Sequence, residues 1–222
     1  MNRRTLPAAA VVFAATAAFL LTACGGGSDD SSDKDKIAGA DAAPGKKSTS
    51  PEASPSNDGI ERPKVELPKG VKNVFEGRST GDATKDAVLA DNERGINAES
   101  AAILSGDQDS SALSFYNKGE ALLSEAKYVQ SFLDAGISYK GTIRYFDRRV
   151  TLVDAKTATL VYCADESGAS NTDRKTGKVK AAGQTKPKDN FVLYNTRLTL
   201  NAKGVWQNTK GFGKRGAASC AK

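Results

Sequence analysis

The chain has 222 residues, of which 39% are hydrophobic and 26% charged, with a formal net charge of +6. This length allows one domain with extensions or two small domains. The sequence contains no histidine, which excludes Ser-His-Asp and Cys-His catalysis, HExxH zinc sites and most transition-metal sites. A glycine-rich phosphate motif is also missing from it. We therefore expect no catalytic residue, no metal site and no cofactor.

The N-terminal residues have the composition of an export signal. Arg3 and Arg4 precede an apolar run over residues 8–23 that is broken only by two threonines. As a helix this run would be about 24 Å long, shorter than the roughly 30 Å needed to cross a bilayer. A basic start, a short apolar segment and small residues at its end are typical of a secretory signal peptide. We expect residues 1–23 to be this signal.

The apolar run ends in Leu21-Thr22-Ala23-Cys24, which resembles the lipobox of bacterial lipoproteins. The resemblance implies that diacylglycerol is attached to the sulfur of Cys24 and that the chain is cleaved just before it. Two fatty acyl chains, such as palmitate, hold a protein durably on a membrane. The alternative is an ordinary signal peptide with a cysteine there by chance. The expected location is the outer face of the cell membrane, with a lipid anchor.

Residues 24–70 are expected to form a disordered tether. They are rich in Ser, Asp, Lys, Gly, Ala and Pro and contain no aromatic residue. Such a segment buries too little apolar surface to offset its loss of chain entropy. As a flexible coil it would span about 35–40 Å and hold the following domain, residues 71–222, off the membrane.

The first half of this domain has the apolar spacing of helices. Leu89, Ile96 and Ile103 recur every seven residues between positions 81 and 106, where Gly95 and Asn97 could divide the segment into two helices. A short helical turn is expected after residue 110. Residues 120–135 place their apolar side chains on one helical face, and a glycine follows at the C′ position.

From residue 141 onward the apolar period changes from 3.6 to 2, which indicates strands. We expect strands over residues 141–154, 157–165, 190–201 and 204–210, with a bulge at residues 147–149. Residues 175–178 are expected to turn a further hairpin. Helices followed by an antiparallel meander predict an α+β domain, in which N-terminal helices pack on a curved antiparallel sheet.

This succession of elements resembles the nuclear-transport-factor-2-like fold, which ketosteroid isomerases and SnoaL-type cyclases share. The details resemble a set of actinobacterial secreted lipoproteins with such a domain: residues 158–165 resemble their cysteine-bearing strand, residues 173–179 their hairpin, residues 204–206 their last strand and Cys220 their terminal cysteine. The resemblance implies a cone-shaped domain, with the chemistry of the enzymes of this fold located between sheet and helices.

An isomerase of this kind needs an aspartate base and a tyrosine or protonated aspartate facing the substrate oxygen. Asp147, Asp154 and Asp165 are associated with predicted strands, and no spacing pairs any of them with a tyrosine. We interpret them as solvated carboxylates. The possible tyrosine donors, interpreted as residues at the edge of the core, are Tyr116, Tyr128, Tyr145, Tyr162 and Tyr194.

Lipidation of Cys24 leaves two cysteines, Cys163 and Cys220. An even pair in an exported chain predicts a disulfide, which would join the C-terminal tail to the sheet. The alternative is two buried free thiols.

Charge is distributed unevenly along the domain. Residues 71–139 hold 6 Lys and Arg against 11 Asp and Glu, whereas residues 140–222 hold 17 against 6. A basic surface outside a cell would attract anionic lipid headgroups or wall polymers, and nucleic acid is not expected there. The alternative is a solvated face without a ligand. The candidate anion-binding residues are Arg144, Arg148, Arg149, Arg174, Lys175, Lys178, Lys180, Lys186 and Lys188.

We therefore expect a membrane-anchored extracytoplasmic lipoprotein whose domain is a non-catalytic binding or assembly module at the cell envelope. Its expected partners are the membrane, through the anchor, and an anionic envelope polymer or another envelope protein. The alternative is a small-molecule pocket protein, either a carrier or a histidine-free isomerase- or cyclase-like enzyme. A cavity with a carboxylate and a tyrosine in reach of each other would favour the pocket. A cone filled by Phe132, Tyr145 and Trp206 would favour the binding module.

Overall fold

The computed structural model describes residues 58–181 and 186–221. The expected signal peptide, Cys24 and most of the expected tether lie outside these residues. Within the described part of the chain, no helix is both long enough and apolar enough to span a membrane.

Three helices form the first half of the domain: α1 (Ala83–Ser105), α2 (Ser111–Tyr116) and α3 (Glu120–Asp134). The Asp82 carboxylate caps α1 by accepting hydrogen bonds from the backbone N–H groups of Thr84 and Lys85. Gly95 does not divide α1 into two helices. A Cβ at Gly95 would lie 3.3 Å from Cβ of Tyr116, so the glycine allows α2 to pack closely on α1.

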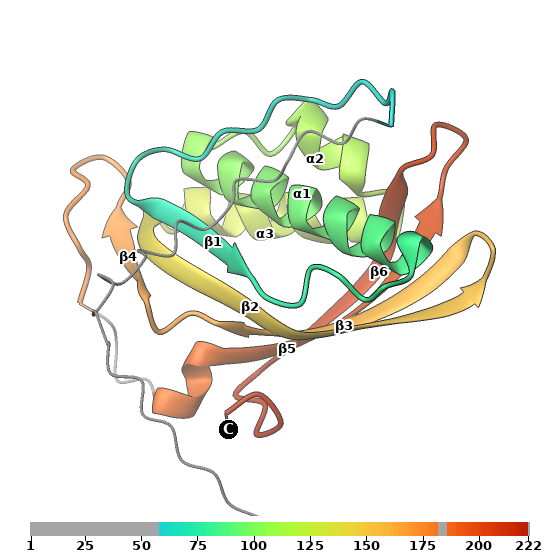
Figure 1. Cartoon of the computed structure of the whole chain (residues 1–222). Coiled ribbons are helices and arrows are strands. Elements are labelled where there is room, and N and C mark those ends of the chain that lie inside the picture. Colours follow the sequence, from blue (N-terminus) through green and yellow to red (C-terminus); the bar gives the residue numbers. More distant parts are fainter. Residues whose placement is uncertain (1–57, 182–185, 222) are drawn as a thin grey trace, which may run out of the picture. The chain divides into compact units, whose positions relative to one another are not determined.

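The five strands of the second half are β2 (Ile137–Asp154), β3 (Thr157–Asp165), β4 (Ala169–Asp173), β5 (Phe191–Leu200) and β6 (Trp206–Arg215). Antiparallel pairing joins β2 to β3, β3 to β5 and β5 to β6, and β4 pairs with the beginning of β2. The three helices lie together on one side of the curved sheet (Figure 1). The α+β arrangement expected from the sequence is therefore confirmed.

One strand was not expected. β1 (Val71–Phe75) pairs in parallel with β2, so the sheet is mixed and not wholly antiparallel. The short, isolated segment lacks the long alternation that marks the other strands. Its pairing depends on β2, whose edge it covers, and the aromatic ring of Phe75 stacks on that of Tyr145 at a centroid distance of 5.0 Å.

The expected bulge in β2 is confirmed. The register between β2 and β3 shifts between Phe146 and Arg149, and Asp147 has a positive φ of 51°. Nearer the beginning of β2, Gly141 has a φ of 112°. A Cβ there would lie 2.2 Å from the carbonyl oxygen of Gly168. A side chain at residue 141 would therefore prevent β4 from pairing with β2.

The main core lies between α1 and the sheet. Val88 and Leu89 of α1 are fully buried against Leu160, Leu198 and other residues of the strands. A second cluster joins the C-terminal part of α1 to α2 and α3. Together these contacts hold the helices against one face of the sheet, because each helix buries an apolar stripe there.

Residues 58–70 contact the domain, although the sequence placed them in the tether. The Arg62 guanidinium lies 3.3 Å from the buried carboxylate of Asp91, which also accepts a hydrogen bond of 2.9 Å from the backbone N–H of Trp206. Ile60 and Val65 pack beside Val205. A pair of apolar residues and one ion pair are too weak a local pattern to distinguish this segment from the polar chain before it.

Candidate functional site

Arg148 does not belong to a surface that could bind anions. Its side chain is fully buried and forms an ion pair with Glu93, and its Nη2 also donates to the carbonyl oxygen of Leu89 over 2.8 Å. The bulge of β2 turns this arginine toward α1, whereas its neighbour Arg149 is exposed. The sequence could not distinguish the two arginines because a bulge changes which residues face inward.

Arg144 and Arg174 are also occupied by contacts within the domain. The Arg144 guanidinium lies 3.1 Å from the carboxylate of Glu76 and 3.4 Å from that of Asp165. Arg174 donates to the carbonyl oxygens of Ile103 and Leu104, where the end of α1 carries partial negative charge. These arginines hold elements of the fold together.

The remaining candidates are exposed, and most of them lie in two neighbouring segments. Lys175, Lys178 and Lys180 belong to the hairpin after β4, and Lys180 Nζ lies 3.9 Å from the Asp173 carboxylate. Lys186 directly precedes a 3₁₀ helix (Pro187–Asn190), and Lys188 lies within it. Of the nine candidates, only these lysines and Arg149 are therefore exposed. Further exposed basic residues of the sheet include Arg197, Lys210 and Lys214.

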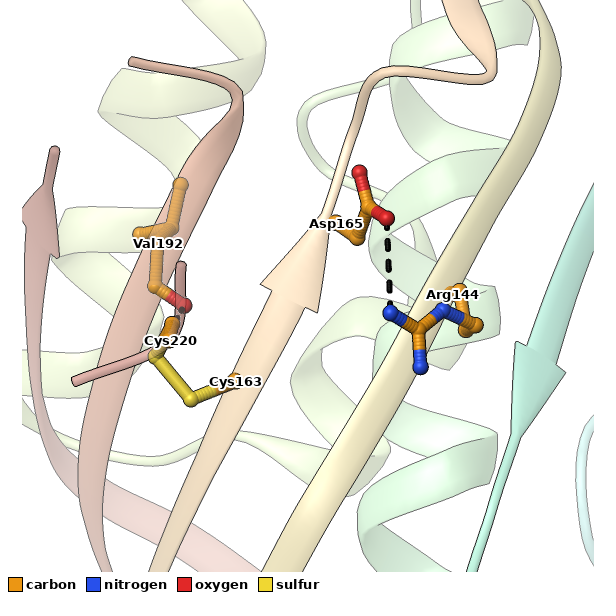
Figure 2. Close-up of a disulfide and its surroundings, with 5 residues drawn as sticks. All are labelled: Arg144, Cys163, Asp165, Val192 and Cys220. Atoms are coloured by element: carbon orange, nitrogen blue, oxygen red, sulfur yellow. Dashed lines mark hydrogen bonds and ion pairs between the residues drawn. A yellow bond between two sulfur atoms is a disulfide. The ribbon is translucent and has the colours of Figure 1, made fainter. Parts of the chain in front are cut away.

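Cys163 and Cys220 form a disulfide, as expected, with Cα atoms 5.6 Å apart. Both residues are buried, and Cys220 Sγ lies 3.8 Å from the carbonyl oxygen of Val192 on β5 (Figure 2). Figure 2 also shows Arg144 of β2 and Asp165 of β3 paired beside this bond. The crosslink therefore fixes the C-terminal segment to the middle strands of the sheet.

A cavity of about 970 Å³ lies between the sheet and the helices α1 and α3. Five of the six tyrosines of the chain line it: Tyr128, Tyr139, Tyr145, Tyr162 and Tyr194. Tyr116 does not. Phe132 and Tyr145 are part of the lining and leave this space open, while Trp206 lies in the core beside it. The cone is therefore not filled by these three residues.

Strand pairing places the tyrosines side by side. Tyr162 of β3 and Tyr194 of β5 are register partners, and their rings stack with a centroid distance of 5.0 Å. The ring centroid of Tyr145 on β2 lies 6.2 Å from that of Tyr162. Burial is the main cause that raises the pKa of Tyr139 to about 12 and the pKa of Tyr145 well above its ordinary value. The hydroxyls therefore act as hydrogen-bonding groups and carry no charge near neutral pH.

Four acidic residues line the cavity: Glu99 from α1, Glu125 from α3, Glu166 and Asp189. Glu166 is paired with Arg215, and Asp189 accepts a hydrogen bond from the backbone N–H of Lys186. Glu99 and Glu125 form a pair with each other.

Burial, followed by repulsion from Glu125, raises the pKa of Glu99 well above its ordinary value. Burial also raises the pKa of Glu125, and a hydrogen bond to Glu99 partly opposes this. Neither carboxyl forms an ion pair with a basic residue of the described chain. Such a pair titrates as one unit, in which a protonated carboxyl donates to its ionised partner.

Other polar groups reach the cavity from α1 and from β5 and β6. Ser100, Thr196 and Asn208 line it. The Thr196 hydroxyl is occupied by a hydrogen bond to the carbonyl oxygen of Leu160. In contrast, Oδ1 of Asn208 is buried and accepts no hydrogen bond from the described residues. Oδ1 of Asn208 is therefore an unused acceptor in the cavity wall that is not itself exposed to the cavity.

The sequence did not identify the glutamate pair, and its aspartate candidates lie elsewhere. Asp147 and Asp154 are exposed at the bulge and in a turn, and Asp165 is paired with Arg144. A signal for the glutamates was present. Glu99 follows Ile96 by three residues and precedes Ile103 by four, and Glu125 has the same relation to Leu122 and Val129. Each is therefore a charged residue inside an apolar helical stripe.

No family model matches the chain, and no curated protein matches it. Solved structures with similarity include a ketosteroid isomerase-like protein from Erwinia carotovora atroseptica, with 16% identity, a TM-score of 0.37, and coverage of 55% of this chain and 92% of the other. The intermembrane space region of the chloroplast protein ARC6 has 16% identity, a TM-score of 0.37, and coverage of 62% and 99%.

A protein from Catenulispora acidiphila has 6% identity, a TM-score of 0.43, and coverage of 64% of this chain and 100% of the other. Identities and TM-scores at this level do not show what this chain binds.

Proposed function

We propose that this domain binds a small organic ligand in the tyrosine-lined cavity, and that the ligand has an apolar body and a hydroxyl or amino group. The carrying observation is the Glu99–Glu125 pair inside an aromatic cavity of about 970 Å³. Clefts of this size with mostly apolar walls and a few converging polar groups are typical of ligand sites. The carboxyl oxygens of the two glutamates favour a ligand that donates hydrogen bonds.

The proposal places this domain outside the cell, anchored to the outer face of the membrane by lipid on Cys24. The basic start, the short apolar run and the lipobox resemblance of residues 1–24 support that location. The proposed function is then that of a membrane-anchored carrier or receptor for a small molecule. We prefer this function to that of a binding or assembly module at the cell envelope.

We further propose that the ligand leaves the cavity chemically unchanged. The chain has no histidine, and the raised pKa values keep these tyrosine hydroxyls protonated near neutral pH, so that they cannot serve as bases. A histidine-free isomerase-like enzyme is the second candidate, which the raised pKa of Glu99 favours, because a protonated carboxyl could act as an acid. Analysis of the bound molecule before and after prolonged incubation distinguishes the two.

The neutral fluorescent amine N-phenyl-1-naphthylamine tests the cavity directly. Its fluorescence should rise on binding to the wild-type protein and saturate at one site. Ser124→Trp places a bulky ring at an exposed position of α3 that lines the cavity, and should weaken binding at least tenfold. Lys127→Trp is the matched control, because Lys127 is exposed on the same helix and does not line the cavity. Equal binding by both variants would contradict the proposed site.

A native ligand is sought in the protein purified from envelope membranes. Denaturation should release a small molecule that mass spectrometry detects in the wild type and in Lys127→Trp, and that is depleted in Ser124→Trp. A substrate of an isomerase would instead be recovered as a mixture that changes with time. A compound that remains constant supports binding without turnover.

A further inference from the structure

The mouth of the cavity is marked by exposed apolar side chains. The described chain has five large hydrophobic residues that are strongly exposed, and three of them line the cavity: Tyr128 at 40%, Val179 at 52% and Phe212 at 66%. They come from α3, from the hairpin after β4 and from β6. Exposed apolar residues that share one cavity lining, in contrast to single scattered residues, are typical of an interaction site. We call these three residues the apolar rim.

Lysines lie close in sequence to Val179 and Phe212, the two residues of the apolar rim that follow β4 and belong to β6, respectively. Lys178 and Lys180 flank Val179, and Lys210 and Lys214 lie two residues before and after Phe212. Lys186 and Lys188 belong to the segment whose last residues, Asp189 and Asn190, also line the cavity. All six lysines are exposed.

Acidic residues neutralise only part of this charge. Lys210 lies 3.3 Å from Glu120, Lys180 lies 3.9 Å from Asp173, and Glu166 is occupied by Arg215. The other four lysines, Lys178, Lys186, Lys188 and Lys214, form no ion pair with the described residues. The surroundings of the apolar rim therefore carry excess positive charge.

The length of chain between the expected anchor and the described domain limits how far the apolar rim can lie from the membrane. Residues 25–57, 33 residues, connect the expected lipid anchor at Cys24 to the described domain. Even fully extended, 33 residues reach at most about 120 Å. The domain would therefore stay near the anionic surface in which its anchor lies, and any part of its surface could reach that membrane.

We propose that the apolar rim docks on the anionic membrane surface, so that the cavity opens toward the bilayer and its ligand exchanges directly with the lipid phase. Tyr128, Val179 and Phe212 would enter the headgroup region, where apolar and aromatic side chains are favoured. The surrounding lysines would contact anionic headgroups. The inference rests on the proposed function and its anchored location. It adds that the ligand comes from the lipid phase of the membrane.

Vesicle flotation tests the docking without the anchor. The chain from residue 24 onward, carrying Cys24→Ser, should float with vesicles of equal phosphatidylglycerol and phosphatidylcholine at low salt. Binding to pure phosphatidylcholine should be at least fivefold lower. The combined change Tyr128→Ser, Val179→Ser and Phe212→Ser should lower flotation with anionic vesicles at least fivefold.

Val153→Ser is the matched control, because Val153 is 56% exposed and does not line the cavity. It lies near the end of the 18-residue strand β2, whose beginning pairs with β4, and it should leave flotation unchanged. Lys178→Glu with Lys214→Glu should also reduce flotation, whereas Lys156→Glu, at the turn beside Val153, should not. Melting temperatures of all variants show whether they fold.

Absence of flotation of the wild-type chain with anionic vesicles would overturn the proposal, and so would normal flotation of the folded rim variant. A loss as large in Val153→Ser as in the rim variant would overturn it too. The same proteins are titrated with N-phenyl-1-naphthylamine in solution. Normal binding of the amine with no flotation would refute the docking surface alone, and the reverse result would refute the proposed cavity function alone.

Discussion

Arg148 and Glu93, 55 residues apart in the sequence, form an ion pair between β2 and α1 inside the domain. The Arg148 side chain has no exposed surface, and that of Glu93 is 7% exposed. The second carboxylate oxygen of Glu93 also contacts Arg78, at 3.2 Å. This pair ties the bulge of the longest strand to the longest helix and therefore helps to hold α1 over the sheet that forms one wall of the cavity.

Arg148→Ala should strongly destabilise the domain, because it leaves the Glu93 carboxylate buried with only its weaker partner. Breaking a buried pair typically costs about 3–5 kcal/mol in the free energy of unfolding. Arg149→Ala should change that free energy by less than about 0.5 kcal/mol, because its side chain is exposed. Urea unfolding of both variants measures the difference, and similar values for the two would contradict the buried pair.

Reduction of the Cys163–Cys220 disulfide should lower the melting temperature of the domain. The bond closes a loop with a sequence separation of 57, which corresponds to about 4 kcal/mol in the chain-entropy account. The double variant Cys163→Ala, Cys220→Ala should melt at the temperature of the reduced protein. Thiol titration of the unfolded, unreduced domain should find neither thiol free, and finding two would refute the crosslink.

The Glu99–Glu125 pair should make the domain less stable as pH rises. The folded pKa of Glu99 lies above the ordinary glutamate value of 4.5, so between these values the native state binds more protons than the unfolded state. The stability gained from the proton is full below about pH 4.5 and is lost as pH rises toward the folded pKa. Each extra proton bound changes the free energy of unfolding by about 1.4 kcal/mol per pH unit.

Glu99→Gln should therefore be more stable than the wild type at pH 8 and similar to it at pH 4, because glutamine has no charge to bury. Its urea midpoint should depend less on pH between 5 and 8. Glu120→Gln is the control on α3, since the Glu120 side chain is 72% exposed. If Glu99→Gln shows the same pH dependence as the wild type, the carboxyl is not held in its protonated form.

Cys24→Ser should release the full-length protein from the membrane fraction or leave its signal peptide uncleaved, because the hydroxyl cannot accept the lipid in place of the thiol. Fractionation of cells followed by immunoblotting measures both outcomes. Ser28→Ala, a few residues further on, should leave membrane retention unchanged. Normal processing together with full membrane retention of the serine variant would show that Cys24 carries no anchor.

Most of the local structure could be predicted from the sequence. The period of apolar residues predicted helices before strands, and the β3 limits agree with the expected ones at both ends. Gly136, expected to follow the third helix, has the positive φ of 60° that suits a C′ glycine. The bulge of β2 and the disulfide were predicted from residue type and from an even cysteine pair. These features depend on neighbours along the chain or on simple counting, so the sequence alone contains them.

Tertiary structure alone decided which charges are free and where the cavity lies. Arg148 and Arg149 are adjacent in the sequence, yet one is buried in an ion pair and the other is exposed. Glu99 and Glu125 occupy the apolar stripes of two helices, and periodicity predicts only that these stripes face inward. The curvature of the sheet determines whether an inward face meets packed side chains or open space. The same stripe that places Ile103 in the core therefore places Glu99 in a cavity.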